Sequence, residues 1–486
     1  MTAEKGKVKA TAFWLIMLAG AVFAINFGRQ LSGDVYWHLK TGQWILTHRA
    51  FPFHDPFSYT ASHTWILQEW GFQVLAYIIS QFSLNALAWL SFLIVLSALF
   101  VSFATCLLRA SRPTAFVITV LSAGVCADMV DIRAQTLGLL MFAILVFFVE
   151  KSLIHRKGLP TWLPLLFVVW ANFHSSFTAG LVLLSIEWVV SLSEAFRHGD
   201  KREKYVRPLR EFVLTTACAL AALINPNGYH LYEFPLRTVG HGGMTSMIAE
   251  WVSPDFRSFA GGSLALFLLV IIWGMARTAA KVDLRHLVRL TIFMLAALIA
   301  RRLGPFFALA CAPIVAELIS CHVDAALRTK SASRATALCV GVLILCGIVF
   351  RISDMQGMSA FDYITTTEVF PAAACDYILR ERPPGEMFNE LNYGSYLIWR
   401  LWPKYKVFVD NRNDIFYGGA FEEFVRVAMS GGNSAWREVF DRRRINLVIM
   451  PRESLLSDVL EESSEWQLSF SDNKAVVYTR VRPLRP

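Results

Sequence analysis

The first residues that could do chemistry lie in a polar, aromatic stretch that follows an apolar N-terminal segment. Asp34 and His38 are four residues apart, so they would share one face of a helix. Asp55 and Glu69 follow in the same stretch. Asp34 lies where a carboxylate could meet a substrate at a membrane surface. The structural alternative is a belt of interfacial aromatic residues with carboxylates that cap helices.

A second group of ionisable residues occupies connections between later apolar segments. Ionisable side chains close to a membrane are candidates for function. Each also has a structural alternative, because an arginine can extend to the interface and a histidine can cap a helix end. Together with the first polar stretch, five connections expected on the same membrane face carry such residues, which favours a shared external cavity. The candidates there are Arg133, His174, Glu250, Arg301 and Arg302.

Apolar helices must position these residues. Of the 486 residues, 55% are hydrophobic and 17% are charged, and the mean hydropathy is +0.46. A soluble chain would carry about 25% charge. An apolar helix at 68–82 is expected at the interface or as a short span. We predict eleven transmembrane helices, near residues 11–27, 85–108, 114–130, 136–150, 161–173, 177–196, 211–225, 259–276, 287–300, 304–320 and 335–351.

The charge distribution predicts how the chain crosses the membrane. The formal net charge of +9 could suggest nucleic acid, but the excess lies in short loops between apolar segments, so we expect no nucleic-acid partner. With the N-terminus inside, 21 lysines and arginines fall on the cytoplasmic side and eight on the outer side before the tail. This asymmetry predicts a cytoplasmic N-terminus and an extracytoplasmic tail. The first helix is expected to stay uncleaved.

The tail changes character and predicts a second domain. Four strand-like runs, at 406–410, 446–450, 466–471 and 475–478, alternate with helix-like runs at 371–382, 395–402, 421–429 and 454–461. This order predicts a soluble α/β domain with a parallel core and a terminal hairpin. We therefore predict a transmembrane domain over 1–352, with a long first external loop at 28–70, and an extracytoplasmic domain over 353–486. The eight cysteines show no spacing typical of a disulfide framework or a zinc site.

The loop residues resemble a known family. Asp34 followed by an aromatic-rich stretch is similar to the first external loop of the integral-membrane GT-C glycosyltransferases, in the bacterial branch related to protein mannosyltransferases and lipid-linked sugar transferases. The similarity continues through most of the chain. The matching residues are Trp37, His38, Leu39, Gly42, Asp55 to Thr60, Glu69, Trp70, Trp170, Asn172, His174, Asn225, Pro226, Gly228, Glu250, Trp251, Tyr393, Gly394, Tyr396 to Trp399, Asp410 and Arg412.

The resemblance implies a multi-pass protein of a bacterial cytoplasmic membrane that transfers a sugar from a polyprenyl-phosphate donor to a glycan, lipid or protein acceptor with inversion. In that scheme Asp34 is the general base. Arg133, Arg301 or Arg302 could hold the departing phosphate, because a guanidinium pairs bidentately with phosphate oxygens. His38, Asp55, Glu69, His174 and Glu250 are the other candidate substrate-binding residues.

The chain departs from the family at one position. Many members have two adjacent acids where this chain has Gly33, Asp34 and Val35. We expect no cofactor, although Asp34, Asp55 and Glu69 could converge on a divalent cation. Two further functions stay open. A bundle of this type could bind, present or move a lipid-linked glycan without catalysis. A transporter would place ionisable residues at the bilayer midplane, and Glu187 is the main candidate.

Overall fold

The chain divides into two compact units. The computed structural model describes residues 2–30, 33–127, 131–197, 205–240, 250–277, 282–428 and 435–484. Unit 1 comprises residues 1–30 and 85–364, and unit 2 comprises residues 31–84 and 365–486. The predicted domains placed the first loop with the transmembrane helices, whereas the compact units group this loop with the tail.

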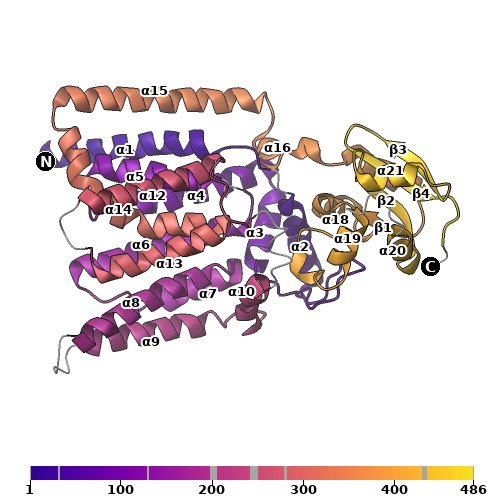
Figure 1. The fold of residues 1–486 in the computed structure, drawn as a ribbon, viewed down its shortest axis with the longest axis horizontal. Coiled ribbons are helices and arrows are strands. Elements are labelled where there is room, and N and C mark those ends of the chain that lie inside the picture. The colour runs from indigo at the N-terminus through magenta and orange to yellow at the C-terminus, as the bar shows by residue number, and fades with distance from the viewer. Residues whose placement is uncertain are drawn as a thin grey trace. The chain divides into compact units, whose positions relative to one another are not determined.

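Unit 1 is helical, and each of the eleven predicted transmembrane ranges forms a helix. Its helices run side by side in Figure 1. Within the described ranges, six helices are long and apolar enough to cross a membrane. The eleven helices are α1 (Thr2–Asn26), α4 (Leu84–Cys106), α5 (Arg112–Val125), α6 (Ala134–His155), α7 (Leu163–Phe173), α8 (Phe177–Arg197), α9 (Val206–Ala221), α12 (Phe259–Arg277), α13 (Leu284–Ile299), α14 (Gly304–Ala326) and α15 (Lys330–Met355).

Short polar connections determine where these helices begin. A proline stands in the first turn of α5, α7 and α14, where its missing N–H costs no intrahelical bond. The Asp283 side chain accepts a hydrogen bond from the backbone N–H of Arg285 and so caps α13. Helix α14 packs against α5, α6, α12 and α13 and is the most buried of the long helices. Unit 1 also contains α10 (His230–Gly240) and α16 (Ala360–Thr365).

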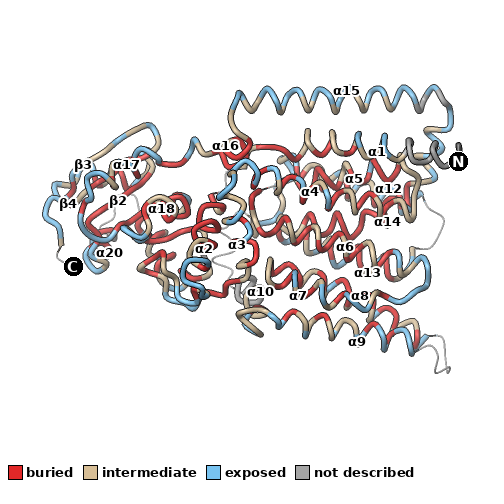
Figure 2. The backbone as a smooth tube through the Cα atoms, turned by 180° about the vertical axis from the view of Figure 1, so that it is seen from behind, coloured by how far each residue is buried: buried red, intermediate tan, exposed pale blue. Residues whose placement is uncertain are grey.

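Helix α15 lies at the edge of unit 1 and packs on α1 (Figure 2). A Cβ atom at Gly347 would lie 2.8 Å from the Cβ of Ala24, so this crossing needs a glycine. The Arg351 guanidinium donates to the carbonyls of Ala24 and Ile25, at 3.0 and 3.3 Å, and so satisfies groups at the C-terminus of α1. The other face of α15 exposes apolar side chains, as expected for a helix in lipid.

A buried ion-pair network joins helices at the end of unit 1 where α6 and α8 end and α13 begins. Arg289, which is fully buried, pairs with Glu150 and with Glu187, the latter at 2.7 Å. Arg109 binds the second oxygen of Glu150 at 2.5 Å, and Arg285 reaches Glu187 at 3.3 Å. Glu187, the main candidate for a transporter residue, is therefore paired within the bundle.

The predicted orientation can be tested by labelling introduced cysteines. Cys321, Cys339 and Cys346 are the exposed native cysteines and are first replaced by serine. In spheroplasts, an impermeant maleimide should label a cysteine at exposed Lys404 of the tail but not one at exposed Arg197 at the end of α8. The opposite pattern would reverse the topology. Residues 198–204, which carry part of the predicted cytoplasmic charge, lie outside the described residues.

The first part of unit 2, residues 31–84, contains two helices. Helix α2 (Asp34–His48) packs on α3 (Trp70–Ser80). A Cβ atom at Gly42 would lie 2.1 Å from the carbonyl oxygen of Gln73, so only glycine permits this close crossing. The predicted apolar helix at 68–82 is α3. Its Leu75 and Ile78 side chains are exposed.

The tail folds around a four-stranded sheet with the order β1-β2-β4-β3. Strand β1 (Glu386–Asn389) pairs in parallel with β2 (Ile445–Pro451). Strand β4 (Ala475–Arg480) is antiparallel to β2 and to β3 (Trp466–Ser471), which gives the predicted terminal hairpin. The helices of the tail are α17 (Ala372–Glu381), α18 (Gly394–Leu401), α19 (Ala420–Ala428), α20 (Ala435–Arg442) and α21 (Leu455–Glu461).

The predicted strand at 406–410 is wrong, and the sheet strand at 386–389 was missed. Residues 407–409 are extended, but they pair with the first loop instead of the sheet. Val407 N–H donates to the Phe57 carbonyl at 3.0 Å, and Thr60 donates to the Phe408 carbonyl. The Asn389 side chain accepts from the Phe408 N–H at 2.8 Å and donates to the Val409 carbonyl at 2.9 Å. These bonds occupy backbone groups that a sheet neighbour would need.

Candidate functional site

The candidate base, Asp34, is the first residue of α2 and is partly buried. Its Oδ1 accepts a hydrogen bond from the Asn411 side-chain amide at 3.0 Å. Asn411 belongs to the tail segment that follows the extended residues 407–409. The loop acid and a tail residue therefore meet within unit 2, although 377 positions separate them in the sequence.

An arginine clamp, defined here as Arg412 with Asp55 and Asp410, lies beside Asn411 in the sequence. Arg412 Nη1 binds Asp55 at 2.7 Å, and its Nη2 binds Asp410 at 2.6 Å. All three side chains are almost completely buried. Burial lowers the pKa of the Arg412 guanidinium, but the two carboxylates outweigh it and raise the pKa above its ordinary value. The structure thus places the candidate ligand Asp55 in a buried ion pair.

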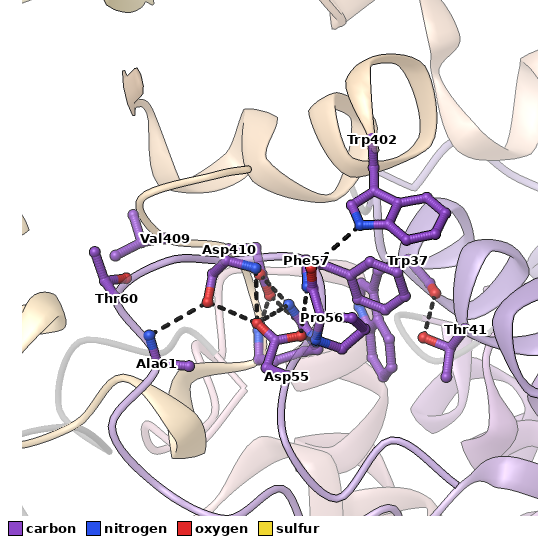
Figure 3. Close-up of polar contacts among 12 residues, drawn as sticks. Trp37, Thr41, Asp55, Pro56, Phe57, Thr60, Ala61, Trp402, Val409 and Asp410 are labelled. Atoms are coloured by element: carbon purple, nitrogen blue, oxygen red, sulfur yellow. Dashed lines mark hydrogen bonds and ion pairs between the residues drawn. The ribbon is translucent and has the colours of Figure 1, made fainter. Parts of the chain in front are cut away.

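Aromatic rings enclose the clamp. The guanidinium carbon of Arg412 lies 4.6 Å from the centre of the Trp65 ring and 5.3 Å from that of Phe57. Asp55 also accepts bonds from the backbone N–H groups of Phe57 and Ser58. Figure 3 shows Asp55, Phe57 and Asp410 together with Trp402, whose indole N–H donates to the Pro56 carbonyl at 3.1 Å. These contacts fix the loop and the tail segment together inside unit 2.

His38 and Glu69 also come together in unit 2. His38 Nδ1 lies 3.6 Å from a Glu69 carboxylate oxygen, and the His38 side chain is only 2% exposed. Glu69 immediately precedes α3. The pair therefore links α2 to the start of α3. Its burial favours a role in holding the loop, while Glu69 keeps 14% exposure.

Two residues of the tail were not among the predicted site residues. Asn411 could be found only through its contact with Asp34. Asp414 lies three residues further on, and burial raises the pKa of its carboxyl to about 7, although Arg412 opposes the shift. The sequence signal for both residues is the polar run from Asp410 to Asp414, which places two aspartates and an arginine within five residues.

Unit 1 contains the other candidates at the end where α6 and α14 begin. Arg133 pairs with Glu250 and, at 2.9 Å, with Asp131. Arg302 lies 3.8 Å from Glu250, and its guanidinium carbon lies 4.6 Å from the centre of the Trp251 ring. Burial raises the pKa of Glu250, but Arg133 and Arg302 outweigh it and lower the pKa to about 2. Three predicted residues therefore form one ion-pair cluster.

Arg301 lies next to this cluster and lines a small cavity. It belongs to the short 3-10 helix Arg301–Leu303 that precedes α14. Other residues of the cavity wall are Val125, Asp255, Ser258 and Gly304. Within the described part of the chain, the buried Nε atom of Arg301 has no hydrogen-bond partner. A guanidinium at a helix N-terminus is chemically suited to an anion.

His174 is buried between α7 and α8. Its Nδ1 accepts a hydrogen bond from the Ser176 N–H at 3.1 Å, which places the proton of a neutral ring on Nε2. Burial and, to a smaller extent, Arg302 lower the pKa of His174 to about 3, while Glu250 opposes the shift. Trp170 donates to Ser176 Oγ at 2.9 Å in the same turn. We therefore place neutral His174 in the connection between the two helices.

His174 should make the protein less stable in mild acid. A histidine takes up protons in the unfolded state near pH 6.5. Its folded pKa is about 3, so its contribution to stability is complete above pH 6.5 and is lost as the pH falls toward 3. When the pH is lowered from 7 to 5, we expect the melting temperature of His174→Gln to fall less than that of the wild type. Equal losses would contradict this assignment.

The structure offers no obvious metal centre in the described ranges. No group of three or more histidine, cysteine, aspartate or glutamate side chains there is arranged to hold a metal ion. Of the three acids considered for a cation, Asp55 is engaged by Arg412 and Glu69 lies against His38.

No protein-family model and no curated protein matches the chain. The fold is similar to two solved structures of an oligosaccharyltransferase from Archaeoglobus fulgidus. One is tethered with an acceptor peptide containing the NVT sequon; the TM-score is 0.51 at 12% identity, over 91% of this chain and 69% of that chain. The other is the archaeal oligosaccharyltransferase AglB in complex with an inhibitory peptide and a dolichol-phosphate; the TM-score is 0.52 at 13% identity, over 92% and 70%.

At 12–13% sequence identity, the similarity to these structures establishes the fold alone. The chain is an α-helical, multi-pass membrane protein with a GT-C-like architecture and a C-terminal α/β domain, as predicted.

Proposed function

We propose that this protein is a membrane glycosyltransferase. It takes a sugar from a polyprenyl-phosphate-linked donor and transfers it to an acceptor at the outer face of a bacterial cytoplasmic membrane. The observation that carries the proposal is the partly buried Asp34, held by Asn411 at the start of α2 within a GT-C-like fold. The solved relatives are oligosaccharyltransferases, and one was solved with a dolichol-phosphate, which supports a lipid-linked donor.

In the proposed reaction, an acceptor hydroxyl attacks the anomeric carbon of the donor sugar. Asp34 takes the hydroxyl proton as the new C–O bond forms. The bond between the anomeric carbon and the phosphate oxygen breaks, and the polyprenyl phosphate leaves with the electron pair. Attack from the opposite face inverts the anomeric configuration. The chemistry needs a base and a stabilised leaving group, but no redox partner.

We propose Arg301 and Arg302 as the residues that bind the departing phosphate. Arg301 has an unpartnered Nε among the described residues and lines a cavity beside the N-terminus of α14. Arg302 lies 3.8 Å from Glu250, too long for a strong ion pair, and it can therefore turn to an anion. Arg133 is already paired with Asp131 and Glu250, which favours a role in holding Glu250.

Profiling of lipid-linked glycans in a deletion strain tests this function. The membrane lipids are extracted and analysed by mass spectrometry, with and without a plasmid that carries the gene. We expect one polyprenyl-phosphate sugar to accumulate in the deletion strain and to return to its normal level with the wild-type gene. An unchanged lipid profile would contradict the transferase assignment.

A second experiment, with purified protein, distinguishes catalysis from the non-catalytic alternative. A protein that only binds, presents or moves the lipid-linked glycan would change the sidedness of the lipid, but purified protein would not consume it. Detergent-solubilised protein is therefore mixed with the extracted lipid and with membranes of the deletion strain as the source of acceptor. Loss of the sugar from the lipid supports transfer, and binding without consumption supports presentation.

A further inference from the structure

We infer that Asn411, a residue of the C-terminal tail, is a positioning residue for the carboxylate of Asp34. This inference rests on the proposed function and extends it, because it makes the tail part of the acceptor side of the site. The carrying observation is the bond of 3.0 Å from the Asn411 amide to Asp34 Oδ1.

The surroundings of Asn411 hold its backbone in place. Asp410 and Arg412, on either side of it, belong to the buried clamp. The preceding residues are fixed by the Asn389 side chain, which bonds to the backbone of Phe408 and Val409. The tail segment thus presents the Asn411 amide from a rigid base, as a group that orients a catalytic side chain requires.

The Asn411 amide is a different kind of partner from the Arg412 guanidinium, which binds Asp55 and Asp410. Asp55 and Asp410 both bind the positively charged Arg412 guanidinium, so their carboxylate oxygens are engaged in a buried ion pair. Asp34 accepts a hydrogen bond from a neutral amide, that of Asn411. An amide N–H fixes the rotamer and the plane of a carboxylate without cancelling its charge. This arrangement suits an acid that must act as a base.

The residue that precedes α2 provides no side-chain cap for the helix. Gly33 precedes the helix and has no side chain to cap it. Asp34 accepts its bond from a residue of the tail, while α2 packs against α18 through Tyr36 and Tyr396, whose ring centres are 5.0 Å apart. The tail therefore holds both the helix and the carboxylate at its first residue.

The inference is tested with Asn411→Asp, which keeps the shape but removes the donor, and with Asn411→Ala. The matched control is Asn446→Ala. Asn446 is another asparagine of the tail. It is buried and exchanges two bonds of 2.9 Å with the backbone of Leu484, but it stands at the start of β2. The donor is the lipid that accumulates in the deletion strain, and acceptor membranes come from the same strain. Rates are measured against donor concentration.

We expect both Asn411 variants to lower the apparent kcat by about 10–100-fold, because a carboxylate displaced by about 1 Å loses rate on that scale. The apparent KM should stay within about twofold of wild type, because no donor contact is removed. Asn446→Ala should lower the melting temperature with little change in kcat. A rise in KM at constant kcat, or a wild-type kcat in Asn411→Ala, would overturn the inference.

A double-mutant cycle separates this inference from the proposed function. If Asn411 acts through Asp34, Asn411→Ala should cause no further loss in the Asp34→Asn background. Independent, multiplying losses would overturn the positioning role. If Asp34→Asn itself keeps wild-type transfer, the base assignment fails, whatever Asn411 does. If Asp34→Asn is inactive and Asn411→Ala is fully active, the positioning inference alone fails.

Discussion

Asp34→Asn is expected to abolish transfer while the protein still folds and reaches the membrane. Asparagine has nearly the same shape as aspartate but cannot take the acceptor proton, and loss of a general base typically costs about 10²–10⁴-fold in rate. The partner Asn411 can still meet an amide oxygen at the same position, so the local structure should survive. The measurement is consumption of the accumulated lipid-linked sugar by purified protein, with binding of that lipid measured in parallel.

Asp414→Asn is the matched control for this result. Asp414 lies in the same tail segment as Asn411, and the pKa of its carboxyl is raised to about 7, so it is the competing base. If Asp34 is the base, Asp414→Asn should retain most of the activity. An active Asp34→Asn with an inactive Asp414→Asn would transfer the catalytic role to Asp414. An active Asp34→Asn with unchanged glycan product would favour binding or presentation of the glycan.

Removal of the clamp arginine is expected to cause the largest loss of stability. Arg412→Met leaves the carboxylates of Asp55 and Asp410 buried without their partner. Breaking a buried ion pair by removal of one side costs about 3–5 kcal/mol. Thermal unfolding of the purified variant should begin at a clearly lower temperature, and limited proteolysis should cut the tail or the first loop first.

Arg400→Met provides the control for the clamp. Arg400 also belongs to the tail, but its partner Asp376 is 64% exposed, and such pairs contribute about 0–1 kcal/mol. Replacement of all three clamp residues by Asp55→Asn, Arg412→Met and Asp410→Asn removes the buried charges together and should recover part of the lost stability. A wild-type melting temperature in Arg412→Met would show that the clamp does not hold the loop and the tail together.

The sequence alone determined most of the helical architecture. All eleven predicted ranges form helices, and six of the described helices are long and apolar enough to cross a membrane, where the backbone must be satisfied internally. The tail was predicted as α/β, and helices α17, α18, α19 and α21 occur close to their predicted positions. Periodicity and composition carry this information locally, so no knowledge of distant contacts was needed.

The candidate site was predicted only in part. Residue type and position made Asp34 the candidate base, and they grouped Arg133, Glu250 and Arg302, which the structure brings together within unit 1. They did not show that Asp55 is engaged by Arg412, or that His174 is neutral in a helix connection. A carboxylate that binds a ligand and one that pairs with a buried arginine have the same sequence signature.

Only the tertiary structure decided which distant segments belong together. It joined the first loop to the tail, because residues 57–60 supply the backbone partners that the extended residues 407–409 lack in the sheet. It also brought Asn411 to Asp34. Composition and periodicity specify which residues are buried and which element each forms. Hydrogen bonds between segments more than 300 residues apart depend on how those elements pack, and no local pattern encodes them.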